Sequence, residues 1–242
     1  MRPAGHPDPG GRLRLPDPAL LVITDRGQAG APLTEIADAL FQAGVRWLML
    51  REKDLDAAAR RDLLRDLVAR GAPFGAAVTV NGDLAAAQAA GAAGVHLPAG
   101  GALGDRLAEA RRALGPGALL GASAHDLDEA LASAASGADY VTLSPVFESA
   151  SKPGYGPALG PAGLEATAVR LAVPAIALGG IAADNAGACL EAGAAGVAVM
   201  GAVMAAADPG AAACALLAAL AAGKPAAGKP AAVGVASGQY LR

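Results

Sequence analysis

The sequence contains little cysteine and little net charge. Two cysteines occur in 242 residues, Cys189 and Cys214, and each stands in an Ala-rich apolar stretch. This usage argues against a disulfide framework or a metal cluster, and it favours a reducing, cytoplasmic environment. The net charge of -3 and the isoelectric point near 5.6 argue against nucleic acid or an anionic membrane surface as a partner.

A long unbroken apolar run is also missing. Residues 192–220 form the most apolar stretch, but Asp208 and Pro209 divide it and glycines interrupt its first half. Neither half reaches the roughly 20 apolar residues that a membrane-spanning helix needs. We therefore expect no membrane segment.

The two ends of the chain differ in composition from the middle. Residues 1–18 are rich in Pro and Gly and lack the continuous apolar core of a signal peptide, which predicts a flexible leader. Residues 223–242 begin with two copies of GKPAA, a composition that cannot bury a core and predicts a flexible tail. One domain is expected over residues 19–222.

Short strand-like runs alternate with longer helix-like stretches through this domain. The amphipathic stretches 32–44 and 56–71 are typical of helices, and Gly44, Gly91 and Gly193 stand where helices would end. Eight strand–helix units predict a single closed (β/α)8 TIM barrel, because short right-handed crossovers place all helices outside the sheet. The eight predicted strands are 20–24, 46–50, 76–80, 93–97, 118–123, 139–144, 174–178 and 196–200.

Two turns stand out at the predicted carboxyl ends of the strands, where TIM barrels build their chemistry. Gly179 and Gly180 follow the seventh strand, and Met200 and Gly201 follow the eighth. Adjacent backbone N–H groups at helix starts attract anions, and this place in the barrel is a frequent phosphate site. We predict phosphate binding here; the alternative is that tight turns simply need glycine.

Cationic residues and histidines follow other strands. Arg51, Lys53 and Lys152 would surround the same end of the barrel and favour a phosphate or carboxylate, unless they are ordinary solvated loop charges. His125 follows a strand and precedes a helix, which suits a neutral acid–base group. His96 alternates with apolar neighbours, which favours a hydrogen-bonded wall residue instead.

Seven ordered motifs resemble the thiamine phosphate synthase and TenI superfamily, over roughly residues 19–222. The resemblance implies a TIM barrel that binds the phosphate of the thiamine thiazole at the glycine turns. The motifs are LREKD (50–54), VNGD (80–83), GVHLP (94–98), GASAHDLDEA (121–130), GADYVTLSPVFESASKPG (137–154), ALGGI (177–181) and EAGAAGVAVMGAV (191–203).

The synthase branch of this superfamily joins a pyrimidine diphosphate to the thiazole phosphate, and its leaving pyrophosphate needs Mg²⁺ held by oxygen ligands. Against the synthase pattern Asn81 is kept, but Gly82 and Gly101 stand where the two metal-binding aspartates are expected. Asp83 lies one residue too far along to be assumed a substitute. Met49 also replaces the glutamine that would read the pyrimidine.

The TenI branch, the thiazole tautomerases, is similar to this sequence where the synthase pattern fails. It implies a metal-independent and cofactor-free enzyme that moves a proton to aromatise a thiazole carboxylate phosphate. His125 and Lys53 are the expected catalytic residues. The residues expected to bind the substrate are Arg51, Asn81, Ser123, Ser149, Ser151, Lys152, Gly179, Gly180, Met200 and Gly201.

Two alternatives remain open on the sequence. Lys53 and the segment from Ser149 to Lys152 match the synthase's pyrophosphate-binding lysine and its hydroxyl-rich segment, so a Mg²⁺-dependent thiamine phosphate synthase is the first alternative. A non-catalytic regulatory protein that binds a phosphorylated ligand on the same barrel is the second. The expected partner is in each case a small phosphorylated thiazole, and a homo-oligomer is compatible with the sequence.

Overall fold

Strand and helix alternate through the residues that the computed structural model describes, 14–148 and 157–223. Eight parallel strands pair in chain order, and β8 pairs back with β1, so the sheet closes into a barrel. The strands are β1 (Leu20–Ile23), β2 (Trp47–Leu50), β3 (Ala77–Asn81), β4 (Gly94–Leu97), β5 (Leu119–Ala124), β6 (Tyr140–Leu143), β7 (Ala175–Leu178) and β8 (Gly196–Val199). The predicted (β/α)8 barrel is confirmed.

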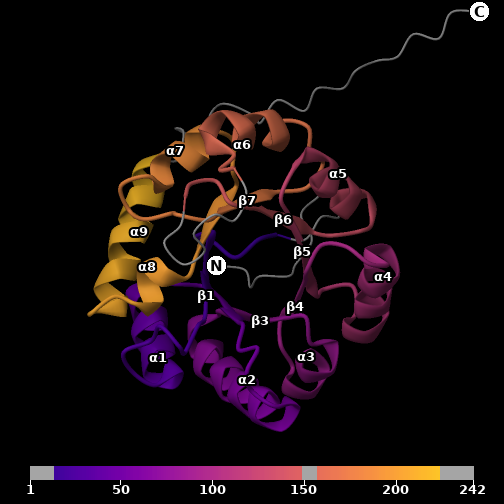
Figure 1. Ribbon diagram of the computed structural model, residues 1–242. Helices are drawn as coiled ribbons and strands as arrows, with labels where there is room; N and C mark the ends of the chain where they lie inside the picture. Colours follow the sequence, from indigo (N-terminus) through magenta and orange to yellow (C-terminus); the bar gives the residue numbers. More distant parts are fainter. Residues whose placement is uncertain (1–13, 149–156, 224–242) are drawn as a thin grey trace, which may run out of the picture.

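The helices form a ring around the strands when the barrel is viewed along its axis (Figure 1). This arrangement covers the outer face of every strand, which is why the strands are apolar on both faces. The helices are α1 (Leu33–Ala43), α2 (Ala57–Gly71), the 3-10 turn η1 (Ala72–Phe74), α3 (Leu84–Ala90), α4 (Leu103–Leu114), α5 (Leu127–Ala135), α6 (Gly160–Ala168), α7 (Ala186–Glu191), α8 (Gly201–Met204) and α9 (Pro209–Gly223).

The strand predictions agree with the structure to within one residue at each end. The glycines expected to stop helices do so: Gly44 and Gly91 adopt left-handed conformations with φ of 104° and 65° at the ends of α1 and α3. Gly193 is also left-handed and follows the last residue of α7 by two positions. No helix in the described part of the chain is long and apolar enough to cross a membrane.

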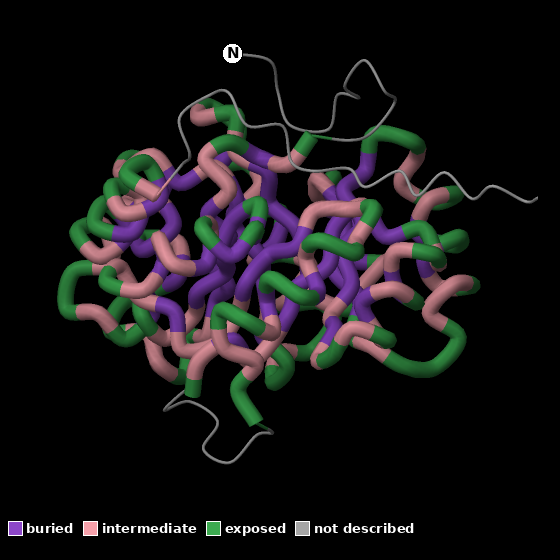
Figure 2. The backbone as a smooth tube through the Cα atoms, turned by 90° about the horizontal axis from the view of Figure 1, so that it is seen from above, coloured by how far each residue is buried: buried purple, intermediate pink, exposed green. Residues whose placement is uncertain are grey.

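Buried residues form one layer between the strands and the helices and a second, smaller cluster inside the barrel. The buried strands occupy the middle of the molecule, and the exposed positions lie on its outside (Figure 2). In the inner cluster the rings of Trp47 and Tyr140 meet edge to face, with centroids 4.8 Å apart. The same cluster contains small residues, among them Ala77, which lies beside Trp47 on the neighbouring strand, and Ala198 on β8.

The packed domain begins earlier than the predicted boundary at residue 19. Leu15 packs against the cluster inside the barrel, and Pro16 is buried. An apolar side chain placed just before β1 gains burial at the end of the barrel where the strands start. These residues of the expected leader therefore belong to the barrel, while residues 1–13 lie outside the described part.

Candidate active site

The carboxyl ends of all eight strands gather at one end of the closed barrel, and we call the loops that follow them the mouth. His125 lies here, between β5 and α5. Its Nδ1 is 2.9 Å from the carbonyl oxygen of Ser144, which follows β6. A carbonyl can only accept a hydrogen bond, so Nδ1 carries the proton of the neutral ring and Nε2 is the basic nitrogen.

The backbone around His125 is fixed by two reciprocal hydrogen bonds at the start of α5. Asp126 caps the helix, because its Oδ1 accepts the backbone N–H of Glu129 at 2.8 Å. The Oε2 of Glu129 in turn accepts the backbone N–H of His125 at 2.9 Å. This variant of the capping box holds the histidine against the first turn of the helix.

A buried carboxylate joins the loops after β1 and β2. Glu52 is 3 % exposed, and its Oε1 accepts the hydroxyl of Thr24 at 2.6 Å. Both of its oxygens also accept the backbone N–H of Arg26, at 3.2 and 3.1 Å. Glu52 therefore organises the mouth, while the exposed Arg26 side chain forms an ion pair with Asp54.

The two cations predicted in this part of the mouth have no ion-pair partner among the described residues. Arg51 is half-buried and its backbone N–H bonds the hydroxyl of Thr24, whereas Lys53 is exposed. Arg26, which the sequence did not single out, is the neutralised cation of this group. Arg51 and Lys53 thus keep their charge for an anion that enters the mouth.

Asn81 and Ser123 lie at the ends of β3 and β5. Asn81 is half-buried and its side-chain amide has no hydrogen-bond partner in the described part of the chain. Ser123 is also half-buried, and its Oγ lies 3.0 Å from Nε2 of His96. His96 itself is a buried, hydrogen-bonded wall residue, as its alternation with apolar neighbours predicts. Burial lowers its pKa to about 4, so its ring is neutral at physiological pH.

The glycines after β7 are required by close packing. Gly179 and Gly180 have φ of 101° and 62°, in the left-handed region. A Cβ on Gly180 would overlap the carbonyl oxygen of Glu148 and lie 2.8 Å from Cβ of Phe147. The side chain of Asn185 then fixes the turn, because it donates to the carbonyl of Gly180 and accepts from the N–H of Ala182, both at 2.9 Å.

The turn after β8 differs from the one after β7. Gly201 is not in the left-handed region, and a Cβ there would meet only the side-chain oxygen of Gln28, at 3.1 Å. The two turns therefore differ in backbone conformation, and anion binding by their N–H groups stays a prediction. Met200 precedes α8 and packs on both hydrophobic clusters, so it contributes an apolar wall rather than a hydroxyl or a charge.

The residues at the synthase's metal positions do not fit Mg²⁺. Gly82 and Gly101 offer no side-chain oxygen, and a Cβ at either position would meet nothing within 4 Å. Asp83 is not a substitute, because its Oδ1 caps α3 through the N–H of Ala86 at 2.9 Å and its Oδ2 pairs with Arg60 at 2.8 Å. No group of three His, Cys, Asp or Glu in the described residues could hold a metal ion.

Three of the predicted binding residues, Ser149, Ser151 and Lys152, fall in the segment 149–156, which lies outside the described residues. The sequence did not point to Thr24, Glu52 or Asn185, which hold the mouth loops in place. The sequence does contain an indication for Thr24 and Asn185, because short hydroxyl and amide side chains next to turns commonly form hydrogen bonds with the backbone. The partner of Glu52 is 28 positions away in the sequence, and local spacing carries no such information.

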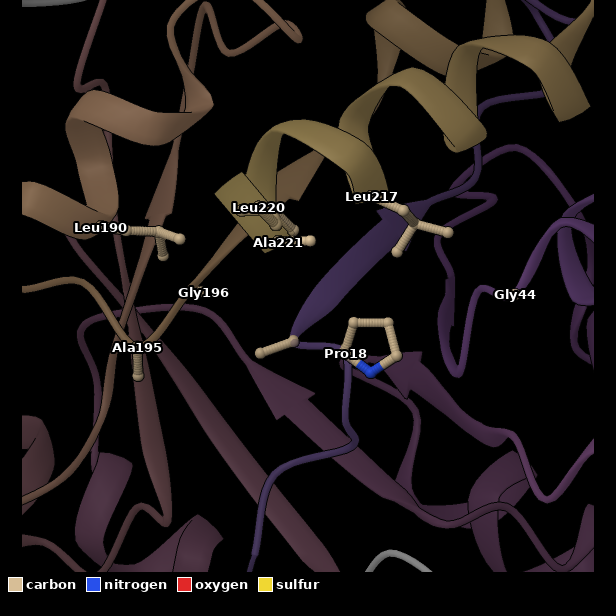
Figure 3. Close-up of a pocket in the computed structure, with 9 residues that line it drawn as sticks. Pro18, Gly44, Leu190, Ala195, Gly196, Leu217, Leu220 and Ala221 are labelled. Atoms are coloured by element: carbon tan, nitrogen blue, oxygen red, sulfur yellow. The ribbon is translucent and has the colours of Figure 1, made fainter. Parts of the chain in front are cut away.

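Two cavities open on the surface of the barrel. One, of about 390 Å³, lies between α9, α7 and the starts of β1 and β8, at the end opposite the mouth (Figure 3). Its lining of residues such as Pro18, Leu190 and Leu217 contains no titratable group, so it offers no chemistry. The other, of about 440 Å³, lies between α5 and the loop that carries Gly100 and Gly101.

Comparison with known proteins gives the same family as the motifs. The model of the family described as thiamine monophosphate synthase matches residues 20–203. A putative thiamine-phosphate synthase of Geobacter sulfurreducens is 43 % identical over 205 residues, which cover 84 % of this chain and 95 % of that protein. A thiamine-phosphate synthase of Salinispora tropica is 40 % identical, with 87 % of this chain and 97 % of that protein covered.

A solved structure agrees with the sequence comparison. Thiamine phosphate pyrophosphorylase from Pyrococcus furiosus superposes with a TM-score of 0.74 at 28 % identity, over 84 % of this chain and 96 % of that chain. Barrels that are only 18 % identical, such as the KDPGal structure with a TM-score of 0.65, share the fold alone. The matches cover the whole barrel from β1 to the start of α8, and the chain belongs to the thiamine monophosphate synthase family.

Proposed function

We propose that this chain, a thiamine biosynthesis enzyme by family, is a metal-independent thiazole tautomerase that aromatises thiazole carboxylate phosphate. The observation that carries the proposal is the replacement of both metal carboxylates by glycine, together with the engagement of Asp83 by Arg60 and by the cap of α3. A synthase must neutralise a departing pyrophosphate, and the described residues of the mouth include no cluster of ligands for the ion that does so. A tautomerase needs only an acid–base group and an anion site.

His125 supplies the acid–base group in this proposal. Its Nδ1–H is held by the carbonyl of Ser144, so Nε2 presents the lone pair that removes a proton from the thiazole ring system. The protonated ring then returns a proton at the second position. The same hydrogen bond to the carbonyl remains in both protonation states, and the imidazole keeps its orientation through the cycle.

The charged ends of the substrate are bound by separate parts of the mouth. The turn at Gly179 and Gly180 presents backbone N–H groups to the phosphate, as in other TIM barrels that bind phosphate beside the seventh and eighth strands. Arg51 and Lys53, which no acidic side chain in the described residues neutralises, attract the carboxylate.

Thiamine phosphate synthase is the second candidate. The names of the relatives favour it, and the unpaired Arg51 and Lys53 suit a pyrophosphate as well as a carboxylate. It would require either a reaction without the family's metal carboxylates or an ion bound by other groups.

The purified chain should be given both substrate sets, with and without a chelator. We expect isomerisation of the thiazole carboxylate phosphate that survives the chelator and falls at least about 100-fold in His125→Gln, the usual scale of a lost general acid–base group. Binding of the thiazole phosphate by His125→Gln is the control for an intact mouth. Mg²⁺-dependent formation of thiamine phosphate at enzymic rates would contradict the proposal, and binding without any turnover would favour the regulatory alternative.

A further inference from the structure

A chain of hydrogen bonds inside the barrel leads to Ser123 at the mouth. The Nδ1 of His96 on β4 lies 3.1 Å from the hydroxyl of Tyr140 on β6, and its Nε2 lies 3.0 Å from Oγ of Ser123 on β5. The hydroxyl of Thr142 is 3.5 Å from the same Nε2, at the limit of a hydrogen bond. The proposed proton transfer by His125 does not use this network.

The barrel is built to bring these groups together. His96 is 3 % exposed and Tyr140 is fully buried. Gly121 on β5 lies between them, and a Cβ at this position would overlap both the phenol of Tyr140 and the ring of His96. Ser123 is two residues further along β5, next to the last residue of the strand, and it is half-buried with its Oγ in contact with the network.

Both buried groups are neutral. Burial lowers the pKa of His96 to about 4, and burial together with the charge of Asp139 raises the pKa of Tyr140 above its usual range. A neutral imidazole has one N–H donor and one acceptor nitrogen, and a phenol has one O–H donor. The network can therefore run in one of two directions.

The hydroxyl of Tyr140 decides the direction. His96 is its only hydrogen-bond partner among the described residues, so the phenolic O–H is satisfied only if it donates to Nδ1. The opposite direction would bury an unpaired donor, which is costly, whereas Ser123 can turn its proton to the mouth at little cost. With Nδ1 as acceptor, Nε2 carries the ring proton and donates to Oγ of Ser123.

We infer that Tyr140 and His96 are positioning residues that fix Ser123 as a hydrogen-bond donor toward the ligand in the mouth. Its oxygen accepts from Nε2 of His96, so its proton points away from the network and meets an acceptor on the ligand. Under the proposed function, on which this part of the inference rests, that acceptor is the carboxylate of the thiazole carboxylate phosphate.

The tautomer of His96 can be measured without any substrate. The chain has three histidines, and the ring-nitrogen shifts of ¹⁵N-labelled histidine distinguish a protonated from an unprotonated nitrogen. Comparison with His125→Gln removes the signals of that residue. We expect the wild-type spectrum to show His96 with the proton on Nε2, and Tyr140→Phe, which removes the donor to Nδ1, to raise the fraction of the Nδ1–H form. Thr79→Val, which removes a buried barrel hydroxyl that bonds Leu48 and not His96, should leave the tautomer unchanged.

The effect on the ligand is measured by calorimetry with two probes, the thiazole carboxylate phosphate and the thiazole phosphate that lacks the carboxylate. We expect Ser123→Ala to reduce the preference for the carboxylate about tenfold, since a hydrogen bond to a charged group is lost, and Tyr140→Phe to reduce it by less. Thr79→Val should keep the wild-type preference.

Each result bears on the inference separately from the proposed function. A wild-type His96 with its proton on Nδ1 overturns the inference, whatever reaction the enzyme catalyses. An unchanged carboxylate preference in Ser123→Ala also overturns it. If His96 has the expected tautomer but the protein isomerises no substrate, the inference about the network holds and the proposed tautomerase function is wrong.

Discussion

His96 on β4 and His125 just after the neighbouring strand β5 differ in location and in hydrogen-bond partners. His125 lies at the mouth with Nδ1 on a backbone carbonyl, while His96 is enclosed by side-chain hydroxyls inside the barrel. The alternation of His96 with Val95 and Leu97 predicted its place in the wall. The identity of its partners could not be predicted, because Tyr140 and Ser123 come from other strands and meet it only through the register of the closed sheet.

The buried histidine should make stability depend on pH. The pKa of His96 falls from 6.5 to about 4 on folding, so below pH 6.5 the unfolded chain binds a proton that the folded chain does not. The free energy of unfolding therefore decreases as pH falls from about 6.5 to about 4, and this residue contributes a loss of about 2 kcal/mol between pH 7 and pH 5.

Urea unfolding of the wild type and of His96→Gln at both pH values tests this. The variant loses the hydrogen bonds at either pH, but it has no titrating ring. The stability advantage of the wild type should shrink by about 2 kcal/mol at pH 5. Equal pH slopes for the two proteins would show that His96 is not held neutral by burial.

At the scale of the element, the turn after β7 and the turn after β3 form a matched pair. Gly180 and Gly82 both have left-handed backbones, with φ of 62° and 73°. A Cβ on Gly180 would overlap the loop after β6, whereas a Cβ on Gly82 would meet nothing within 4 Å. Both alanine substitutions carry the left-handed penalty of about 1 to 2 kcal/mol.

Only Gly180→Ala should also displace the neighbouring loop. We expect it to lower the free energy of unfolding by about 1 to 3 kcal/mol more than Gly82→Ala does, and to weaken binding of the thiazole phosphate. Chemical denaturation and calorimetry of the two variants provide the measurement. If both variants lose the same free energy of unfolding, the close contact between the β7 turn and the loop after β6 does not make Gly180 necessary.

The elements themselves could be predicted well from the sequence. Apolar runs and glycine stops are local signals, and they were enough to place all eight strands. Because eight strand–helix units were counted, a closed barrel could be predicted as well. The architecture of the mouth depends on longer distances. The bond from Thr24 to Glu52 and the ion pair of Arg60 with Asp83 link separate strand–helix units, and the second of these decides that Asp83 is unavailable to a metal.

At the scale of the whole molecule, the last helix holds the first and last units of the barrel together. α9 packs across α1 and α7, and its side chains Leu216 and Leu220 are 1 % and 4 % exposed. The barrel closes where β1 meets β8, so this helix covers the seam between the two ends of the sheet. The sequence predicted the helix region but took the residues beyond 222 as a tail, and that boundary stays a prediction.

Two truncations separate the helix from the tail. A chain that ends at residue 223 keeps every contact that the structure describes, and its thermal midpoint should equal that of the full chain within a few degrees. A chain that ends at residue 208 loses both buried leucines of α9. Each is worth about 2 to 5 kcal/mol, so together they approach the whole stability of an ordinary domain, and this chain should not show a cooperative unfolding transition. A marked loss of stability in the chain that ends at residue 223 would instead show that residues 224–242 contribute to the fold.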